Sequence, residues 1–156
     1  MDNRTQKRKI GDLGEDLACR FLIGKGFTVI ERNYLRPYGE IDIVVKKEGK
    51  LIFVEVKTVT RGTNPFVSGE TNGGIGESGT RVTLPNVSRE KVLHGNGGYR
   101  AEDNIHPWKI KRLQKTIESY LTRFKQVPEW QLDAIIVSLD KVSRTAKIKH
   151  LQHIVL

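Results

Sequence analysis

The sequence has a single cysteine, few aromatic residues and no long apolar run. One cysteine, Cys19, among 156 residues excludes an internal disulfide framework and any zinc site built from clustered cysteines. No apolar stretch approaches the ~18 residues that a membrane-spanning helix needs. The first four residues lead into further charge and not into the apolar core of a signal peptide. We therefore expect a cytoplasmic protein with no membrane partner.

What is present is the composition of an ordinary globular protein, with 37% hydrophobic residues and 15 glycines. A chain of 156 residues fits one domain with a buried core. Nine of the 15 glycines fall in residues 61–106, which show no clear periodicity. A structureless link of that length is unusual in a compact domain. We therefore expect a single domain over residues 1–156 with a glycine-rich insertion at about 61–106.

Two helices are predicted from apolar residues at helical spacing. The first carries Ile10, Leu13, Leu17 and Phe21 and ends around residues 24–26. Pro107 opens the second, whose apolar stripe reaches Phe124 before Pro128 stops it. The same stretch contains Trp108, which, like Trp130, is interpreted as core or hinge packing and not as a platform for a nucleobase.

Five strands are predicted around these helices, at 27–33, 40–47, 51–59, 132–138 and 146–150. Residues 36–39 form a turn, and 81–84 are the best strand candidate inside the insertion. The order is therefore α-β-β-β-(insertion)-α-β-β, an α/β fold.

A two-residue hairpin at Glu48-Gly49 sets the predicted register of the second and third strands, because it pairs Lys47 with Lys50. That register places Asp42 opposite Glu55, and residue 40 opposite residue 57. Cβ atoms of opposed residues lie ~4.5–5.5 Å apart. A slip by one residue would scatter these groups to opposite faces.

The charge is basic overall but unevenly distributed. The chain has 27 Lys and Arg against 18 Asp and Glu, a net charge of +9, which favours a polyanionic partner. Residues 108–126 hold six basic residues and one acidic residue, whereas residues 11–45 hold six acidic and four basic ones. Carboxylates near a phosphate-binding surface are useful to a protein that holds a cation against a phosphate.

The candidate chemistry lies in Glu15, Asp42, Glu55 and Lys57, with the carbonyl of Val56 between the last two. Charged residues inside a strand as apolar as 51–54 are costly unless they are paired or bind a ligand. Two carboxylates ~5 Å apart repel by ~3 kcal/mol at an effective dielectric constant of ~20. Clustered carboxylates with a backbone carbonyl favour Mg²⁺ or Mn²⁺ over Zn²⁺. Such an ion polarises a phosphoryl oxygen and acidifies a bound water, which Lys57 would orient.

These residues resemble the YraN family of small bacterial proteins, within the PD-(D/E)XK nuclease superfamily that includes the archaeal Holliday-junction resolvases. The resemblance covers roughly residues 7–60 and 107–156. It rests on Gly11, Gly14, Glu15 and Ala18; on Arg32, Asn33 and Tyr34; on the segments 39–42 (GEID) and 53–57 (FVEVK); and on Pro107, Lys109, Leu113, Tyr120, Leu121 and Asp133.

The resemblance implies a restriction-endonuclease-like core, a mixed central sheet flanked by helices, and metal-dependent phosphodiester hydrolysis. Asp42, Glu55 and the Val56 carbonyl would bind Mg²⁺ or Mn²⁺, Lys57 would assist the attacking water, and Glu15 would support the metal. Residues 61–106 are longer than the link expected in this family.

Nucleic acid is the expected partner, DNA before RNA, and DNA that is branched or nicked is the favoured substrate. The predicted phosphate contacts are basic residues of the second helix, the first strand and the N-terminal arm: Lys109, Lys111, Arg112, Lys115, Arg32, Lys7 and Arg8. Nothing in the sequence indicates base-specific readout.

Structural readings stand beside these functional ones. Asp42 and Glu55 could form a structural ion-pair cluster with Lys57, and Glu15 could be an ordinary solvated helix residue. Two other functions also stay open: a nucleic-acid-binding module that does not cleave, and an interaction subunit that binds a protein partner through residues 61–106. A homodimer is a further open alternative.

Overall fold

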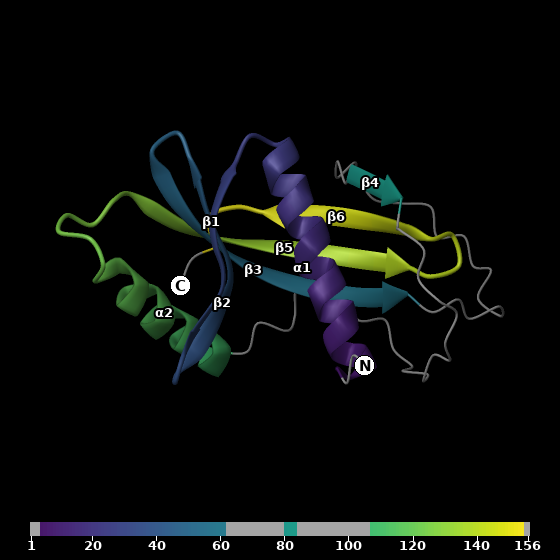
Figure 1. Ribbon diagram of the computed structural model, residues 1–156, viewed down its shortest axis with the longest axis horizontal. Coiled ribbons are helices and arrows are strands. Elements are labelled where there is room, and N and C mark those ends of the chain that lie inside the picture. The colour runs from purple at the N-terminus through teal and green to yellow at the C-terminus, as the bar shows by residue number, and fades with distance from the viewer. Residues whose placement is uncertain (1–3, 62–79, 84–106, 155–156) are drawn as a thin grey trace.

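The computed structural model describes residues 4–61, 80–83 and 107–154 (Figure 1). The helices and strands in these ranges confirm the predicted α/β order, and a short strand lies inside the insertion close to the candidate at 81–84. The remainder of the predicted insertion is outside the described residues. The elements are α1 (Gln6–Gly24), β1 (Thr28–Arg36), β2 (Gly39–Lys47), β3 (Lys50–Arg61), β4 (Thr80–Thr83), α2 (Pro107–Leu121), β5 (Trp130–Asp140) and β6 (Thr145–Leu151).

The strands form one mixed sheet in the order β1-β2-β3-β5-β6-β4. Strands β3 and β5 are parallel, and the other neighbouring pairs are antiparallel. A parallel pair needs a long crossover connection, and this one includes helix α2. Strand β3 lies inside the sheet, between β2 and β5, so the predicted site residues Glu55 and Lys57 are on an internal strand.

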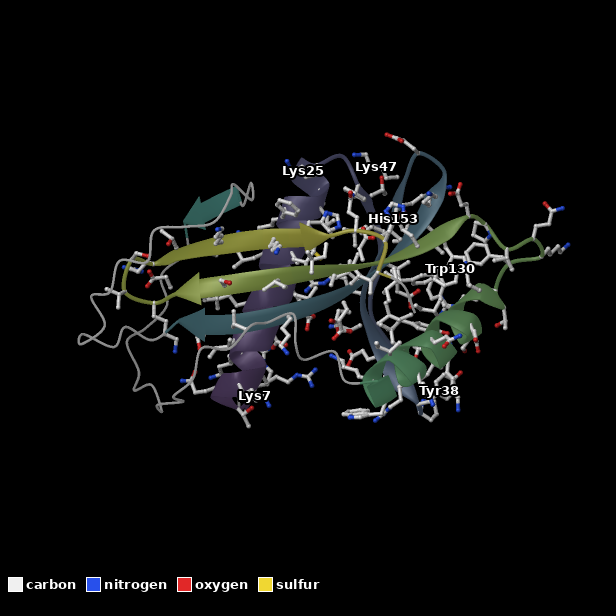
Figure 2. The ribbon with its side chains drawn as sticks, turned by 180° about the vertical axis from the view of Figure 1, so that it is seen from behind. Lys7, Lys25, Tyr38, Lys47, Trp130 and His153 are labelled. Atoms are coloured by element: carbon white, nitrogen blue, oxygen red, sulfur yellow. The ribbon has the colours of Figure 1, made fainter. Side chains whose placement is uncertain are left out.

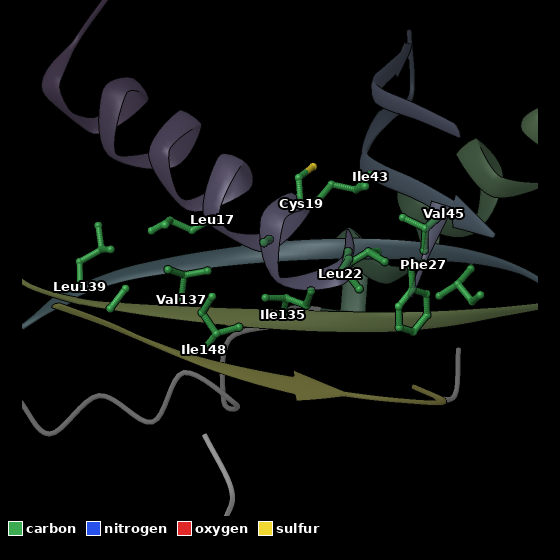
Figure 3. Close-up of a cluster of buried hydrophobic side chains, with 14 residues drawn as sticks. Leu17, Cys19, Leu22, Phe27, Ile43, Val45, Ile135, Val137, Leu139 and Ile148 are labelled. Atoms are coloured by element: carbon green, nitrogen blue, oxygen red, sulfur yellow. The ribbon is translucent and has the colours of Figure 1, made fainter. Parts of the chain in front are cut away.

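Helix α1 packs on one face of the sheet through the larger apolar cluster (Figure 3). Thr5 caps the helix by accepting a hydrogen bond from the backbone N–H of Arg8, and Gly26 follows its C-terminus with a positive φ of 82°. Leu17, Ala18 and Leu22 of the helix face Val54 of β3 and its neighbours. Each large side chain buried in this way contributes ~1.5–3 kcal/mol.

Helix α2 packs on the other face through the second cluster, in which Leu113 and Ile117 meet Phe53. The ring of Tyr120 lies 5.4 Å from Phe53 and 5.0 Å from Tyr34, both edge-on. Trp130 packs against Phe53 at 5.7 Å, as expected for a core residue. Residues of β3 thus alternate between the two helix layers, Ile52 and Val54 toward α1 and Leu51 and Phe53 toward α2.

Two glycines let the helices approach the sheet closely. A Cβ atom at Gly14 of α1 would lie 1.8 Å from Oγ1 of Thr58 on β3. A Cβ atom at Gly39, where β2 begins, would lie 2.7 Å from Oγ1 of Thr116 on α2. A side chain at either position would therefore force the helix away from the sheet. Both close contacts lie next to the strands that carry the candidate site.

The β2–β3 hairpin has the predicted register. Glu48 and Gly49 both have positive φ, 51° and 81°, as the tight two-residue turn requires. Lys47 pairs with Lys50, and the ladder continues to Ile43 opposite Val54.

The β1–β2 hairpin changes face at Asn33, which has a φ of 53° in the middle of β1. Alternation would put residues 32 and 34 on the same face, but Arg32 contacts α1 whereas Tyr34 packs in the α2 cluster. Strand β2 follows this change, because Ile43 belongs to the α1 cluster and Ile41 to the α2 cluster. Strict alternation along residues 40–47 predicts that Ile41 shares a face with Ile43, and that prediction is wrong because of this bend.

Two further observations concern the length of the helices. Helix α2 ends at Leu121, before Phe124, whose side chain is 39% exposed. Within the described residues, neither helix is long and apolar enough to cross a membrane.

Candidate functional site

The β2–β3 ladder ends just before the predicted site. Its last pair is Ile43 with Val54, and beyond this point the side chain of Asp42 takes over the connection. Its Oδ2 accepts a hydrogen bond of 2.6 Å from the backbone N–H of Val56. The predicted opposition of Asp42 and Glu55 therefore lies past the end of the regular ladder, and the carboxylate faces the strand that carries Glu55.

Three carboxylates interact at this position. Burial raises the pKa of Asp42 to about 8, with further increases from the charges of Glu55 and Glu15, whereas the Val56 hydrogen bond and Lys109 lower it. Such a shift means that the folded protein disfavours the charged form of Asp42. A bound cation would relieve this excess of negative charge.

Glu15 reaches the site from helix α1. Burial raises its pKa, and the guanidinium of Arg32 is the strongest influence in the other direction. Arg32 lies 3.8 Å from Oε2 of Glu15 and 2.8 Å from Oδ1 of Asp16. The structure thus gives Arg32, predicted as a phosphate contact, a second role as a partner of the α1 carboxylates.

Glu55 has a protein-supplied counter-charge. The ammonium group of Lys109, in the first turn of α2, forms an ion pair with Oε1 of Glu55. The Glu55 side chain is 12% exposed and that of Lys109 is 48% exposed, so the cation reaches the carboxylate from the solvent side. The prediction that Lys109 contacts phosphate stays a prediction; in this structure its ammonium group is paired with Glu55, where it would compete with a metal ion for the carboxylate.

Lys57 lies two residues after Glu55 on β3 and is half-buried. It is opposite Ile136 in the parallel register with β5. In the part of the chain that the structure describes, Lys57 is not among the residues lining the pocket that contains Asp42 and Glu55.

That pocket lies between the start of β2, strand β3 and the first turns of α2. It has a volume of about 270 Å³. It brings together two of the predicted metal ligands and two of the predicted phosphate contacts. The residues that line it are Gly39, Glu40, Asp42, Glu55, Trp108, Lys109, Arg112 and Leu113.

Trp108 is the residue that the sequence analysis misassigned. It is not core packing, because its side chain is 54% exposed and lines the pocket. The guanidinium of Arg112, one turn further along α2, lies 5.8 Å from the ring. No sequence pattern indicates this position, because it depends on how the first turn of α2 packs relative to β2.

The remaining predicted phosphate contacts are spread around the pocket. Lys111 and Lys115 are exposed on α2, and Lys7 and Arg8 are exposed at the start of α1, where Figure 2 labels Lys7. Arg8 lies 3.8 Å from Asp12. The structure does not bring these four side chains into the pocket itself.

The donor set fits a hard divalent cation in its chemistry. Carboxylate oxygens of Asp42 and Glu55 and the carbonyl of Val56 are the ligand types that Mg²⁺ and Mn²⁺ prefer. Among the described residues, no group of three or more His, Cys, Asp or Glu side chains is already arranged to hold a metal ion. The pairing of Glu55 with Lys109 accounts for part of this, since it directs one carboxylate oxygen to the ammonium group.

A fully buried aspartate, Asp133, provides a contrast with the half-buried Asp42. Asp133 on β5 is fully buried and accepts hydrogen bonds from the Gln131 side chain and the backbone N–H of His153, and it contacts His150 Nε2 at 2.8 Å. Protein groups therefore compensate the burial of Asp133. Asp42 instead faces two other carboxylates, which is why it stands out as a functional group.

Comparison with known proteins identifies relatives along most of the chain. The model of "Uncharacterised protein family UPF0102" matches residues 14–72. A UPF0102 protein of Neisseria meningitidis serogroup C is 32% identical over 131 residues, 83% of this chain and 84% of that protein. One of Roseiflexus castenholzii is 42% identical over 108 residues, 67% of this chain and 77% of that protein.

A shorter match is more similar. The UPF0102 protein of Dictyoglomus turgidum is 57% identical over 51 residues, which are 33% of this chain and less than half, 43%, of that protein.

Proposed function

The chain belongs to the YraN family, UPF0102, whose fold is nuclease-like, and on that premise we propose that it is a Mg²⁺- or Mn²⁺-dependent endonuclease acting on DNA. The observation that carries the proposal is the half-buried Asp42 carboxylate, which lines one pocket with Glu55 and whose pKa is raised by burial and by the charges of Glu55 and Glu15. Acidic groups held together at a cost to the fold are typical of sites that bind a cation or transfer protons.

In this proposal Asp42, Glu55 and the Val56 carbonyl would hold the metal ion; when bound, the ion would supply Lewis-acid chemistry at a phosphoryl oxygen and lower the pKa of a water. Lys57 orients the attacking water and offsets charge that develops on the phosphate. Glu15, steadied by Arg32, adds negative charge on the α1 side. Lys109 leaves Glu55 for a phosphate oxygen when DNA binds, since both partners offer it an anion.

The DNA backbone is expected to run along the basic side of the pocket. Lys109 and Arg112 line the pocket, and the exposed Lys111 and Lys115 extend the positive charge along α2. Phosphate contacts of this kind position a duplex but carry no sequence information. We therefore expect recognition of DNA architecture, with nicked or branched DNA preferred.

The test is a panel of labelled substrates in Mn²⁺: single-stranded, duplex, nicked, flap and four-way DNA, and matched RNA. The wild-type protein should cleave at least one DNA form. Asp42→Asn and Asp42→Ala should lose about 100-fold or more of this activity while binding persists, because they remove a metal ligand. Glu118→Gln, an exposed acid on α2, is the matched control and should cleave normally. Equal cleavage by the Asp42 variants would refute the proposal.

One observation favours a second candidate, a DNA-binding module that does not cleave. Glu55 already has a counter-charge from Lys109, so the acidic cluster is partly neutralised without a metal. This candidate predicts binding that weakens steeply with salt and no cleavage of any substrate in the panel.

A further inference from the structure

Trp108 has an unusual position for a large aromatic residue in this fold. The rings of Tyr34, Phe53 and Tyr120 are buried between α2 and the sheet, whereas Trp108 is 54% exposed at the wall of the pocket. An isolated exposed apolar side chain is common on protein surfaces. Trp108 differs because its ring shares a pocket with Lys109 and Arg112.

Arg112 is fixed beside this ring. Its Nε donates a hydrogen bond of 2.5 Å to the carbonyl oxygen of Tyr38, and its guanidinium lies 5.8 Å from the Trp108 ring centroid. Figure 2 shows Tyr38 beside helix α2. The turn between β1 and β2 therefore holds Arg112 next to the aromatic face. A planar guanidinium can also form a bidentate interaction with a phosphate.

The pocket thus offers a flat aromatic face, two cations from α2 and three carboxylates from β2 and β3. A ligand that matches these groups together has a planar π-system, an anionic group and affinity for a metal ion. A nucleotide within a DNA strand has all three. At about 270 Å³ the pocket is slightly smaller than small-ligand clefts of roughly 300–1,000 Å³, a size that suits one nucleotide and not a duplex.

We propose that Trp108 is a stacking platform for one unpaired nucleobase of the DNA substrate, with Arg112 holding an adjacent phosphate. This inference rests on the proposed function and narrows its substrate class. A base can stack on Trp108 only when it has left the duplex, so the site selects DNA with an unpaired nucleotide beside the reacting phosphate. Intact duplex would meet the cations of α2 without the stacking contact.

The experiment measures binding in EDTA, so that cleavage does not enter. Labelled single-stranded, 5′-flap and fully paired DNA are titrated into wild type, Trp108→Leu and Trp108→Phe. Leucine keeps an apolar side chain without a π-face, and phenylalanine restores one. Phe124→Leu, an exposed aromatic just beyond α2, is the matched control.

Trp108→Leu should weaken single-stranded and flap binding by about fivefold to a hundredfold, the range measured for base–aromatic stacking. Binding of paired DNA should change by less than about twofold, and Trp108→Phe should recover most of the loss. Fluorescence of the wild type should be quenched by single-stranded DNA, and this quenching should disappear in Trp108→Leu. Unchanged single-strand binding, or equal weakening for paired DNA, would overturn the inference.

The two proposals fail separately. Loss of stacking in Trp108→Leu with no cleavage by any form of the protein would leave this inference standing and remove the endonuclease. Normal single-strand binding by Trp108→Leu, with cleavage that depends on Asp42, would support the endonuclease and overturn the stacking inference. If Trp108→Leu does not fold, absence of quenching in the wild type is sufficient to overturn the stacking proposal.

Discussion

The carboxylate of Asp42 on β2 accepts a hydrogen bond of 2.6 Å from the backbone N–H of Val56 on β3, just beyond the last regular pair of the two strands. A side-chain hydrogen bond thereby takes the place of the next backbone hydrogen bond between the two strands. The bond fixes Asp42 against the strand that carries Glu55, and it orients a carboxylate whose pKa is raised by burial and by the charges of Glu55 and Glu15.

The first prediction concerns the stability of the metal-free protein. An unfolded aspartate titrates near 3.8, whereas the pKa of Asp42 in the folded protein is raised to about 8. Between these values the folded state binds the extra proton, so the free energy of unfolding should fall as pH rises from about 4 to 8. The side chain of the Asp42→Asn variant does not titrate. The decline in its free energy of unfolding over this pH range should therefore be smaller than that of the wild type, and the two declines should differ by more than about 1.4 kcal/mol, the equivalent of one pKa unit.

Urea unfolding in EDTA across this pH range provides the measurement. In a parallel series with Mn²⁺ in place of EDTA, the wild-type decline should be smaller, because a cation favours the ionised carboxylate. Parallel pH profiles for wild type and Asp42→Asn would contradict the assignment of the shift to Asp42.

The second prediction concerns Lys109. Because its ammonium group pairs with Glu55, Lys109→Met should tighten Mn²⁺ binding about fivefold, the equivalent of ~1 kcal/mol between nearby charges. Isothermal titration calorimetry, or the electron paramagnetic resonance signal of free Mn²⁺, measures the affinity. Lys115→Met, exposed on the same helix, serves as control and should bind Mn²⁺ like the wild type. Weaker binding by Lys109→Met would exclude competition for Glu55.

The third prediction tests the close approach of α1 to β3. Gly14→Ala would place a Cβ atom 1.8 Å from Thr58 Oγ1, so the helix must shift, at a cost of ~1–3 kcal/mol. Gly11→Ala, one turn earlier, meets nothing within 4 Å and should stabilise the protein by ~0.5–1 kcal/mol. Denaturant unfolding measures both. The double variant with Thr58→Ala should recover part of the Gly14→Ala loss, and no recovery would place the strain elsewhere.

The fourth prediction concerns the bend in the β1–β2 hairpin. Asn33 has a φ of 53°, a region that β-branched residues avoid and glycine enters freely. Asn33→Gly should unfold within ~0.5 kcal/mol of wild type, whereas Asn33→Val should lose ~1–2 kcal/mol. Chemical denaturation followed by circular dichroism distinguishes the two. Equal effects would mean that the backbone conformation of residue 33 is not what holds the bend.

The regular parts of this fold were predictable because local physics decides them. The hairpin at Glu48-Gly49 needs two positive φ values, and this requirement alone fixed the correct register through Ile43. The start of α2 at Pro107 follows from the fixed φ of proline. The proximity of Asp42 to Glu55 followed from the same register, extended by one pair.

The irregular parts were not predictable from periodicity. Alternation assumes a uniform strand, so it could not place Ile41 in the second cluster, which depends on the backbone of Asn33. Helical spacing likewise grouped Phe124 with the α2 stripe, although the helix has ended by that residue. The exposure of Trp108 depends on where the first turn of α2 lies relative to β2, which only tertiary packing determines.

The pocket has an acidic wall, Asp42 and Glu55 on the sheet, and a wall formed by Trp108 and Lys109 of α2, and the two walls differ in how they can move. Glu55 follows directly after four fully buried residues of β3, so the acidic wall can separate only when the whole core unfolds. Trp108 and Lys109 lie in the first turn of α2, where backbone N–H groups have no partner within the helix. This turn can fray on its own, so Trp108 and Lys109 can move while Asp42 and Glu55 stay in register.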